Sequence, residues 1–215
     1  MPPVIQRPVR KCSLTWDALF FDFDGVLADT EPVHFACWSE ILAPLGITFT
    51  WDFYKANCTG VSDKLMVERF AAERVPPLAL EEVWPEYNRK QMMFRRRLEK
   101  QSPFIPATLE LVRSLNGSYK MAVVSSSGRS EVEPPLERAG IRGCFDILVC
   151  GREAEKLKPA PDPYLRAAAL TSAKRPLVIE DSDTGVAAGV AAGFDVLRIV
   201  DAGGVAEAIR RKLGR

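Results

Sequence analysis

Hydrophobic positions along the chain gather in short runs, each about the length of a β-strand. Five such runs stand out, at residues 17–24, 119–126, 145–150, 176–181 and 195–200. Apolar residues at consecutive positions indicate strands that are covered on both faces, as in a parallel sheet. Helix-like stretches separate the last four runs. This alternation predicts an α/β fold with a doubly wound parallel sheet.

The segment between the first two runs has a different pattern. Residues 35–46, 62–75 and 81–100 have the spacing of amphipathic helices and contain no convincing strand. Connections inside a compact domain are normally short, so an insertion of this length indicates a second unit. We predict an inserted α-helical cap domain at residues 30–102 and a core domain formed by residues 15–29 and 103–215. The two junctions should be adjacent in space, as in a hinged lid.

The composition restricts the possible partners. Hydrophobic residues make up 47% of the 215 positions, which is enough for a sizeable core and too many for a disordered chain. The 29 basic and 28 acidic residues leave a formal charge of +1. The chain therefore has no overall field that would attract nucleic acid or an anionic membrane, and any affinity for phosphate must come from a local site. We expect neither partner.

The cysteines and the N-terminal pattern favour a cytoplasmic enzyme. The cysteines are odd in number, scattered, and contain no C-x-x-C pair, so we expect reduced thiols instead of disulfides or a zinc site. They are Cys12, Cys37, Cys58, Cys144 and Cys150. No apolar stretch follows the basic N-terminal residues, as a secretory signal requires, and no apolar run approaches transmembrane length. A monomer is the favoured state.

Acidic side chains lie where two of the predicted strands end. In open α/β sheets, ligands bind beyond the carboxyl ends of the strands. Asp22 and Asp24 end the first run, and their spacing places both on one side of the strand, where a buried pair of like charges needs a cation. Glu180 and Asp181 end the fourth run. Hard oxygen ligands without a histidine or cysteine cluster favour Mg²⁺ over zinc.

The ends of the second and third runs add groups that suit an anion. Ser125, Ser126 and Ser127 form a hydroxyl-rich turn that opens a helix, and Lys158 follows the third run. A magnesium ion, a lysine and backbone amides around a carboxylate are the groups that phosphoryl transfer needs. Each feature also has an ordinary structural explanation: serines cap helices, lysines lie on surfaces, and acids complement helix dipoles. Their occurrence together, in order at four strand ends, favours a functional site.

Four segments carry a resemblance to a known family. The motifs DFDGVLADTEP, VVSSSG, KPAPDPY and VIEDSDTGVAAGVAAG resemble those of the haloacid dehalogenase superfamily, from about Asp17 to Val200. The helical insertion resembles the cap of the subgroup that contains beta-phosphoglucomutase, phosphoglycolate phosphatase and sugar-phosphate phosphatases. The resemblance implies a Rossmann-like core with a helical cap domain. Family members that remove halide lack an acid two residues after the nucleophile, so Asp24 favours phosphate transfer.

The resemblance also implies roles for individual residues. Asp22 matches the nucleophile that becomes an aspartyl phosphate, and Asp24 matches the general acid and base. Ser125 matches the hydroxyl that binds the transferring group, with Ser126 as a further substrate contact, and Lys158 matches the cation beside the nucleophile. The implied magnesium ligands are Asp22, the backbone carbonyl of Asp24, Glu180 and Asp181.

The cap offers weaker candidates for substrate binding. His34 lies at a place that resembles a histidine of beta-phosphoglucomutase, and it also suits packing at the hinge. Asp63 stands where that mutase has an arginine for a second phosphate, so we expect Asp63 to repel such a phosphate. Arg89 and Lys90 lie near a substrate-binding lysine of the mutase, or they belong to a solvated helix face that continues to residues 95–97.

Three functions are compatible with these observations. The favoured one is a Mg²⁺-dependent phosphatase that hydrolyses a small phosphorylated metabolite through an aspartyl phosphate at Asp22. The second is a sugar phosphomutase, and the third is a catalytically inactive binding protein. Intact acids at Asp22, Asp24 and Asp181, together with Lys158, argue against the third.

Overall fold

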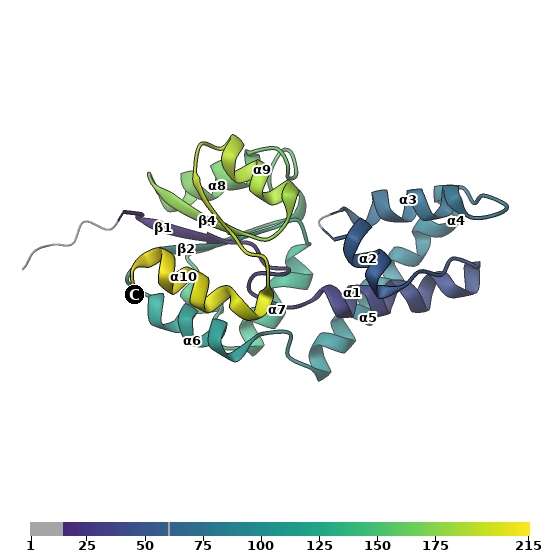
Figure 1. The fold of residues 1–215 in the computed structure, drawn as a ribbon, viewed down its shortest axis with the longest axis horizontal. Coiled ribbons are helices and arrows are strands. Elements are labelled where there is room, and N and C mark those ends of the chain that lie inside the picture. The colour runs from purple at the N-terminus through teal and green to yellow at the C-terminus, as the bar shows by residue number, and fades with distance from the viewer. Residues whose placement is uncertain (1–14, 60) are drawn as a thin grey trace, which may run out of the picture.

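The centre of the molecule is a parallel sheet of five strands in the order β3–β2–β1–β4–β5 (Figure 1). The computed structural model describes residues 15–59 and 61–215. The strands are β1 (Ala18–Phe21), β2 (Lys120–Ser125), β3 (Ile147–Cys150), β4 (Pro176–Glu180) and β5 (Asp195–Arg198). The α/β fold with a parallel sheet, predicted from the five apolar runs, is confirmed.

The register of the sheet brings the carboxyl ends of three strands to one edge. Phe21 of β1 is aligned with Val123 of β2 and with Ile179 of β4. The residues that follow these positions therefore lie side by side, beyond the same end of neighbouring strands. This edge faces the part of the chain that connects β1 to β2 (Figure 1).

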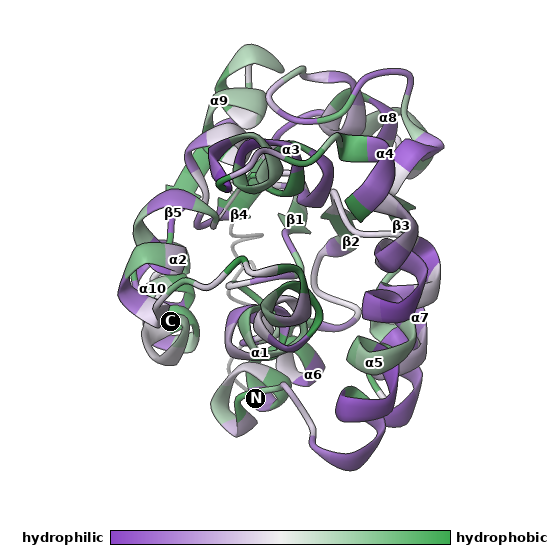
Figure 2. Ribbon diagram, turned by 90° about the vertical axis from the view of Figure 1, so that its right-hand side faces the viewer, coloured by the Kyte–Doolittle hydropathy of each residue, from purple (hydrophilic) through white to green (hydrophobic). Residues whose placement is uncertain are grey.

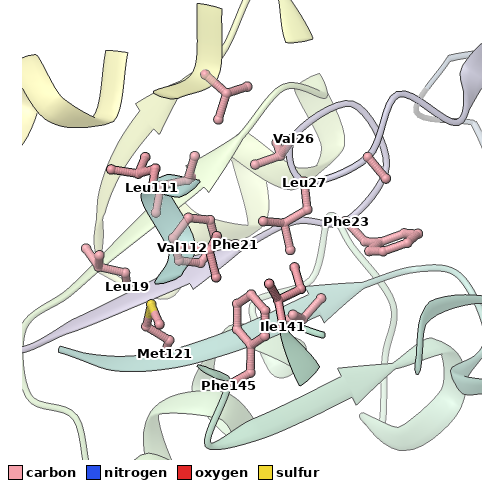
Figure 3. Packing of buried hydrophobic residues seen from close by; sticks show 14 of the residues in the cluster. Leu19, Phe21, Phe23, Val26, Leu27, Leu111, Val112, Met121, Ile141 and Phe145 are labelled. Carbon is pink, nitrogen blue, oxygen red and sulfur yellow. The ribbon is translucent and has the colours of Figure 1, made fainter. Parts of the chain in front are cut away.

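Helices cover both faces of the sheet, as consecutive apolar residues in the strands require. Leu19 and Phe21 point to the face covered by α6 (Pro106–Leu115), α7 (Arg129–Arg138) and α10 (Val205–Leu213), and they pack there in one large buried cluster (Figure 3). Ala18 and Phe20 point to the opposite face, covered by α8 (Asp162–Thr171) and α9 (Asp183–Ala191). Hydrophilic residues predominate along α7 (Figure 2), which leaves only one side of this helix for the core.

The connection from β1 to β2 contains a group of helices beyond the carboxyl edge of the sheet (Figure 1). This helical unit consists of α1 (Glu31–Leu42), α2 (Trp51–Asn57), α3 (Asp63–Glu73), α4 (Leu80–Val83) and α5 (Tyr87–Lys100). It has its own buried cluster, which includes Trp38 of α1, Tyr54 of α2, and Met66 and Phe70 of α3. The helical unit therefore has a hydrophobic core separate from the clusters of the sheet.

Two connecting segments join the helical unit to the sheet, and they lie against each other. The amide of Asp29 donates to the carbonyl of Pro103 at 2.9 Å, and Ala28 forms an antiparallel bridge with Phe104. The way into the helical unit and the way out of it are thus adjacent, although more than seventy positions separate them in the printed sequence. A paired double connection of this kind is compatible with hinge motion.

Proline accounts for the differences between the predicted and observed helices of this unit. The first helix begins at Glu31, earlier than the predicted residue 35, with Pro32 in its first turn, and it gives way to a 3₁₀ turn that contains Pro44. Pro85 divides the predicted stretch 81–100 into α4 and α5, with a 3₁₀ turn between them. Helix α2 was not predicted; Thr50 caps it by accepting the amide of Phe53.

The cysteines among the described residues are free thiols. Cys37, Cys58 and Cys150 are buried free thiols and Cys144 is a partly exposed one, while Cys12 lies outside the described residues. Burial raises the pKa of the Cys150 thiol to about 12, which suits a packing residue and not a nucleophile. No helix within residues 15–59 and 61–215 combines the length and the apolar character needed to cross a membrane.

Candidate active site

Asp22 occupies the first position after β1, at the carboxyl edge of the sheet. Its amide continues the strand ladder by donating to the carbonyl of Ile179 at 2.9 Å, and its side chain is almost completely buried. The chain then turns at Gly25, which has φ of +78°. A Cβ at this position would lie 2.1 Å from Oδ2 of Asp181, so Gly25 permits both the turn and the approach of Asp181.

Lys158 joins the ends of three strands through its ammonium group. Nζ donates to Oδ1 of Asp22 at 2.6 Å, to Oε1 of Glu180 at 2.6 Å, and to the backbone carbonyl of Val124 at 2.8 Å. The side chain is 4% exposed. Burial alone would lower the pKa of Lys158, but the charges of Asp22 and Glu180 raise it well above its usual range, so the lysine remains a cation.

Glu180 is fully buried and accepts donors on both oxygens. Oε1 accepts from Lys158 and from the Tyr164 hydroxyl, the latter at 2.9 Å. Oε2 accepts the amides of Asp181 and Ser182 at 3.0 and 3.1 Å and the Ser182 hydroxyl at 3.1 Å. The carboxylate occupies the space below the first turn of α9, since a Cβ on Gly185 would lie 1.6 Å from Oε1. Gly185 therefore permits close packing of α9 against Glu180.

Three carboxylates converge at this edge. Asp22, Glu180 and Asp181 each offer one oxygen, and these oxygens lie within 4.8 Å of one another. Burial, followed by the charges of the neighbouring carboxylates, raises the pKa of Asp22 well above its usual range in spite of Lys158. Burial and the charge of Glu180 raise the pKa of Asp181 to about 7. One ammonium group thus leaves an excess of negative charge.

This donor set fits a divalent metal ion. Carboxylate oxygens in a crowded, negatively charged cluster are the ligands of hard cations such as Mg²⁺. The side chains of Asp22 and Asp181 are the freer donors, because Glu180 already accepts five hydrogen bonds from the protein. The Asp24 side chain does not belong to the cluster of three carboxylates. The sequence resemblance implies that Asp24 would bind the metal ion through its backbone carbonyl instead.

Asp24 lies on the same loop and is held by a separate set of partners. Oδ1 accepts from the Thr30 hydroxyl, and Oδ2 accepts from the Ser127 hydroxyl at 2.7 Å. Nε2 of His34 lies 3.6 Å from Oδ1. Burial would raise the pKa of Asp24, but His34 and the two hydroxyl donors together lower it to about 2.

The serine turn connects Asp24 to the start of α7. Ser125 is buried at the end of β2, and its hydroxyl accepts the amide of Ser127 at 3.0 Å. Ser126 is exposed to solvent beside it. Gly128 caps α7, whose first turn begins at Arg129. The turn therefore presents hydroxyl groups at the same edge as Asp22.

His34 links the helical unit to an acid side chain of the sheet edge. It lies in the first turns of α1, 3.6 Å from Asp24, and its ring stacks on Phe94 of α5 with 4.1 Å between ring centroids. Nδ1 is buried, and none of the described residues gives it a hydrogen bond. His34 thus combines the two positions considered from the sequence, a contact at the site and packing at the hinge.

Lys90, which is buried, forms an ion pair with the partly exposed Asp63 inside the helical unit. Nζ of Lys90 lies 2.8 Å from Oδ2 of Asp63, and the Trp38 indole donates to Oδ1 at 2.8 Å. Lys90 is completely buried among aromatic rings, with Nζ 5.1 Å from the Phe94 centroid. Lys90 neutralises Asp63, which weakens the basis for the expectation that Asp63 repels a second phosphate.

Arg89 and Lys90 are neighbours in sequence on α5 but differ in burial. Arg89 points outward, is 55% exposed, and lies 3.4 Å from Glu86 one turn earlier. The interpretation of a solvated helix face is therefore correct for Arg89 and wrong for Lys90. The structure gives Arg89 no described contact with the carboxyl edge of the sheet.

Thr30 and Tyr164 were not among the residues predicted from the sequence, and Ser127 was predicted only as part of a turn. Thr30 and Ser127 hold Asp24, and Tyr164 holds Glu180. Thr30 and Tyr164 both belong to motifs that were quoted for the resemblance, so the signal was present. Their partners depend on how separate strand ends come together, which the spacing along the chain does not show.

Comparison with known proteins places this geometry in a family. The family model described as haloacid dehalogenase-like hydrolase matches residues 19–199. Fructose-1-phosphate phosphatase YqaB of Escherichia coli is 30% identical over 84% of this chain and 95% of its own length. A probable pseudouridine-5'-phosphatase of Drosophila melanogaster is 33% identical over 84% of this chain and 80% of its own length.

Solved structures agree with this placement. CbbY of Rhodobacter sphaeroides, in complex with xylulose-(1,5)bisphosphate, superposes with a TM-score of 0.71 at 26% identity, with 84% of each chain covered. Beta-phosphoglucomutase of Clostridium difficile superposes with a TM-score of 0.75 over 92% of this chain and 97% of its own. Because its identity is 20%, that enzyme supports the fold alone.

Proposed function

Because the chain belongs to the haloacid dehalogenase-like hydrolases, we propose that it is a phosphatase that hydrolyses a small phosphorylated carbohydrate or a similar monoester. The observation that supports this most strongly is the contact of Lys158 with Asp22, made at the strand edge where Asp181 and Glu180 converge. A carboxylate, a lysine and a candidate metal site at one point are what transfer of a phosphoryl group requires. Relatives named as sugar phosphate and nucleotide-type phosphatases point to the same class of substrate.

In the first step, the Asp22 carboxylate attacks the phosphorus atom of the ester. A bond forms between a carboxylate oxygen of Asp22 and phosphorus, and the bond from phosphorus to the alcohol oxygen breaks. Asp24 gives its proton to the departing alcohol oxygen. The present partners of Asp24 lower its pKa to about 2, and we expect the negative charge of a bound phosphate to raise that pKa and so favour the protonated form needed for this step.

In the second step, Asp24 takes a proton from water, and the water oxygen attacks the phosphorus atom of the aspartyl phosphate. The bond between Asp22 and phosphorus breaks, so the nucleophile is regenerated and inorganic phosphate is released. Contacts with Thr30, Ser127 and His34 stabilise the ionised Asp24 that acts as the base.

The remaining groups neutralise and position the phosphoryl group. Lys158 and the Ser125 hydroxyl lie at the strand ends beside Asp22. In this position they would contact the oxygens of the phosphoryl group. We assign Asp22, Asp181, Glu180 and the backbone carbonyl of Asp24 to Mg²⁺, which when bound supplies positive charge that keeps Asp22 ionised and lets it approach an anion. The helical unit would act as a cap domain, at residues 30–102, that excludes water.

Hydrolysis is favoured over phosphomutase activity by the state of Lys90. A mutase must hold a doubly phosphorylated intermediate, so it needs a cation in the helical unit as well as one at the sheet edge. Lys90 is a buried cation over the ring of Phe94, on which His34 stacks, and Asp63 already neutralises it. The ion pair thus offers a second phosphate no net attraction.

A panel of phosphate monoesters tests the proposal. With magnesium present, the wild-type protein should release inorganic phosphate from at least one sugar monophosphate, and Asp22→Asn should not. Phosphorus NMR on a sugar 1-phosphate separates the two activities: free phosphate supports a phosphatase. Rapid conversion to the 6-phosphate isomer with little free phosphate would show a mutase, and no reaction with any monoester would refute the proposed function.

A further inference from the structure

Tyr164 is a fully buried residue that touches two members of the candidate site. It lies in the first turn of α8, and its exposed fraction is 0%. Its hydroxyl donates to Oε1 of Glu180 at 2.9 Å, and its ring centroid lies 5.0 Å from Nζ of Lys158. Tyr164 thus contacts both ends of one ion pair, and the proposed reaction has not used it.

The Lys158 ammonium group is shared between two carboxylates. It has three protons, and all three are engaged: one by Asp22, one by Glu180 and one by the carbonyl of Val124. The two carboxylate contacts have the same length, 2.6 Å. The position of the ammonium group therefore depends on how strongly Asp22 and Glu180 each attract it. A group that weakens the attraction by Glu180 moves the ammonium group toward Asp22.

Tyr164 acts on the one oxygen of Glu180 that Lys158 contacts. Oε1 accepts from both Lys158 and Tyr164, while Oε2 accepts the amides and hydroxyl at the start of α9. A neutral O–H donor on Oε1 offsets part of the negative charge that this oxygen presents to the ammonium group. Gly185 lies against this carboxylate, since a Cβ at that position would lie 1.6 Å from Oε1.

We propose that Tyr164 is a positioning residue: its hydroxyl holds Glu180 so that the Lys158 ammonium group stays against Asp22, where the phosphoryl group is transferred. This inference rests on the proposed phosphatase function. Tyr164 itself touches neither the nucleophile nor the transferred group in this scheme. It acts through Glu180 on the position of Lys158.

Tyr164→Phe is the matched substitution, because it removes one oxygen and keeps the ring under the ammonium group. We expect kcat to fall about tenfold or more, the effect of losing a hydrogen bond to a charged group. KM should change little, since Lys158 keeps its charge. Tyr119→Phe is the control: Tyr119 is a nearly buried tyrosine beside β2, at the opposite end of the strand from Ser125, and its loss of a hydroxyl should leave kcat unchanged.

A double-mutant cycle tests the route of action. If Tyr164 acts through Glu180, then Tyr164→Phe combined with Glu180→Ala, which removes the acceptor, should be no slower than Glu180→Ala alone. If the fold-decreases in kcat caused by the two substitutions multiply in the double variant, Tyr164 acts independently of Glu180, and the proposal is overturned. A wild-type kcat in Tyr164→Phe would overturn it as well.

Crystal structures of the wild-type protein and of Tyr164→Phe give a readout that needs no catalysis. We expect Nζ of Lys158 to move toward Glu180 and away from Asp22, beyond the present 2.6 Å. An unmoved ammonium group would refute the inference even if kcat falls. If the wild-type protein hydrolyses no ester, the proposed function fails, and this displacement alone still decides whether Tyr164 positions Lys158.

Discussion

The carboxyl edge of the sheet and the inner side of the helical unit both contain a buried lysine, and the two lysines are paired differently. Lys158 at the sheet edge is surrounded by more negative charge than it can balance. Lys90 in the helical unit is paired with Asp63, also feels the charge of the buried Glu131 of α7, and is otherwise enclosed by aromatic rings. The first arrangement demands a further cation, and the second is complete without one.

This difference separates a site for chemistry from a structural element. A cluster with excess charge is costly until a ligand compensates it, so it is expected where a metal ion and a phosphate bind. A neutral buried pair holds two helices, α3 and α5, in one relative position. We therefore expect substitutions at the sheet edge to abolish activity, and substitutions of the pair to affect stability more than chemistry.

The largest expected effect is that of Asp22→Asn at the sheet edge. An amide does not attack phosphorus, so turnover should fall by about three orders of magnitude or more. The fold should remain, because removing one of three crowded carboxylates relieves repulsion. Circular dichroism and phosphate release measure the two properties. Retention of a tenth of wild-type activity would contradict the covalent scheme.

Removal of divalent metal should come next in size. A chelator should abolish phosphate release, and Mg²⁺ should restore it better than Ca²⁺, which accepts looser and higher coordination. Asp181→Ala should raise the Mg²⁺ concentration required for half-maximal activity, because it removes one of the two freer donors. Full activity in excess chelator would show that the negative charge at this edge has another purpose.

The buried pair of the helical unit should show the opposite balance. Asp63→Asn leaves the Lys90 charge buried without a partner, which costs about 3–5 kcal/mol of the free energy of unfolding. Lys90→Met should lower the free energy of unfolding by less, since methionine fills the aromatic enclosure and the Asp63 side chain is 25% exposed to water. Denaturant unfolding measures both. Equal activity loss in Asp63→Asn and Asp22→Asn, with no loss of stability, would place the pair in the chemistry.

Arg89→Ala should have the smallest effect and provides the matched control for Lys90. Arg89 is adjacent in sequence but exposed, and its pair with Glu86 is a surface contact within one turn. Such pairs contribute about 0.5 kcal/mol or less, so stability and kcat should both be close to wild type. A marked rise in KM would instead assign Arg89 to substrate binding.

The same contrast explains how far the sequence could predict the molecule. The strands and the acids that follow them are local: Asp22 follows an apolar run directly, and Glu180 ends another, so a parallel sheet brings them together. Asp63 and Lys90 are on different helices, and their contact depends on how α3 packs against α5. Residue spacing placed Lys90 beside Arg89 on a solvated face, whereas helix packing places it in the interior. Pro44 and Pro85 explain why the observed helix bounds differ from the predicted ones, and both prolines can be read from the sequence.

The central claim is that Asp22 at the sheet edge receives the phosphoryl group, and chemical trapping tests it most directly. Borohydride reduces an aspartyl phosphate to homoserine, and peptide mass spectrometry identifies the position. During turnover of a substrate that releases free phosphate, we predict homoserine at position 22, dependent on substrate and Mg²⁺. Homoserine at another aspartate position, or no homoserine at position 22 while phosphate is being released, would contradict the account.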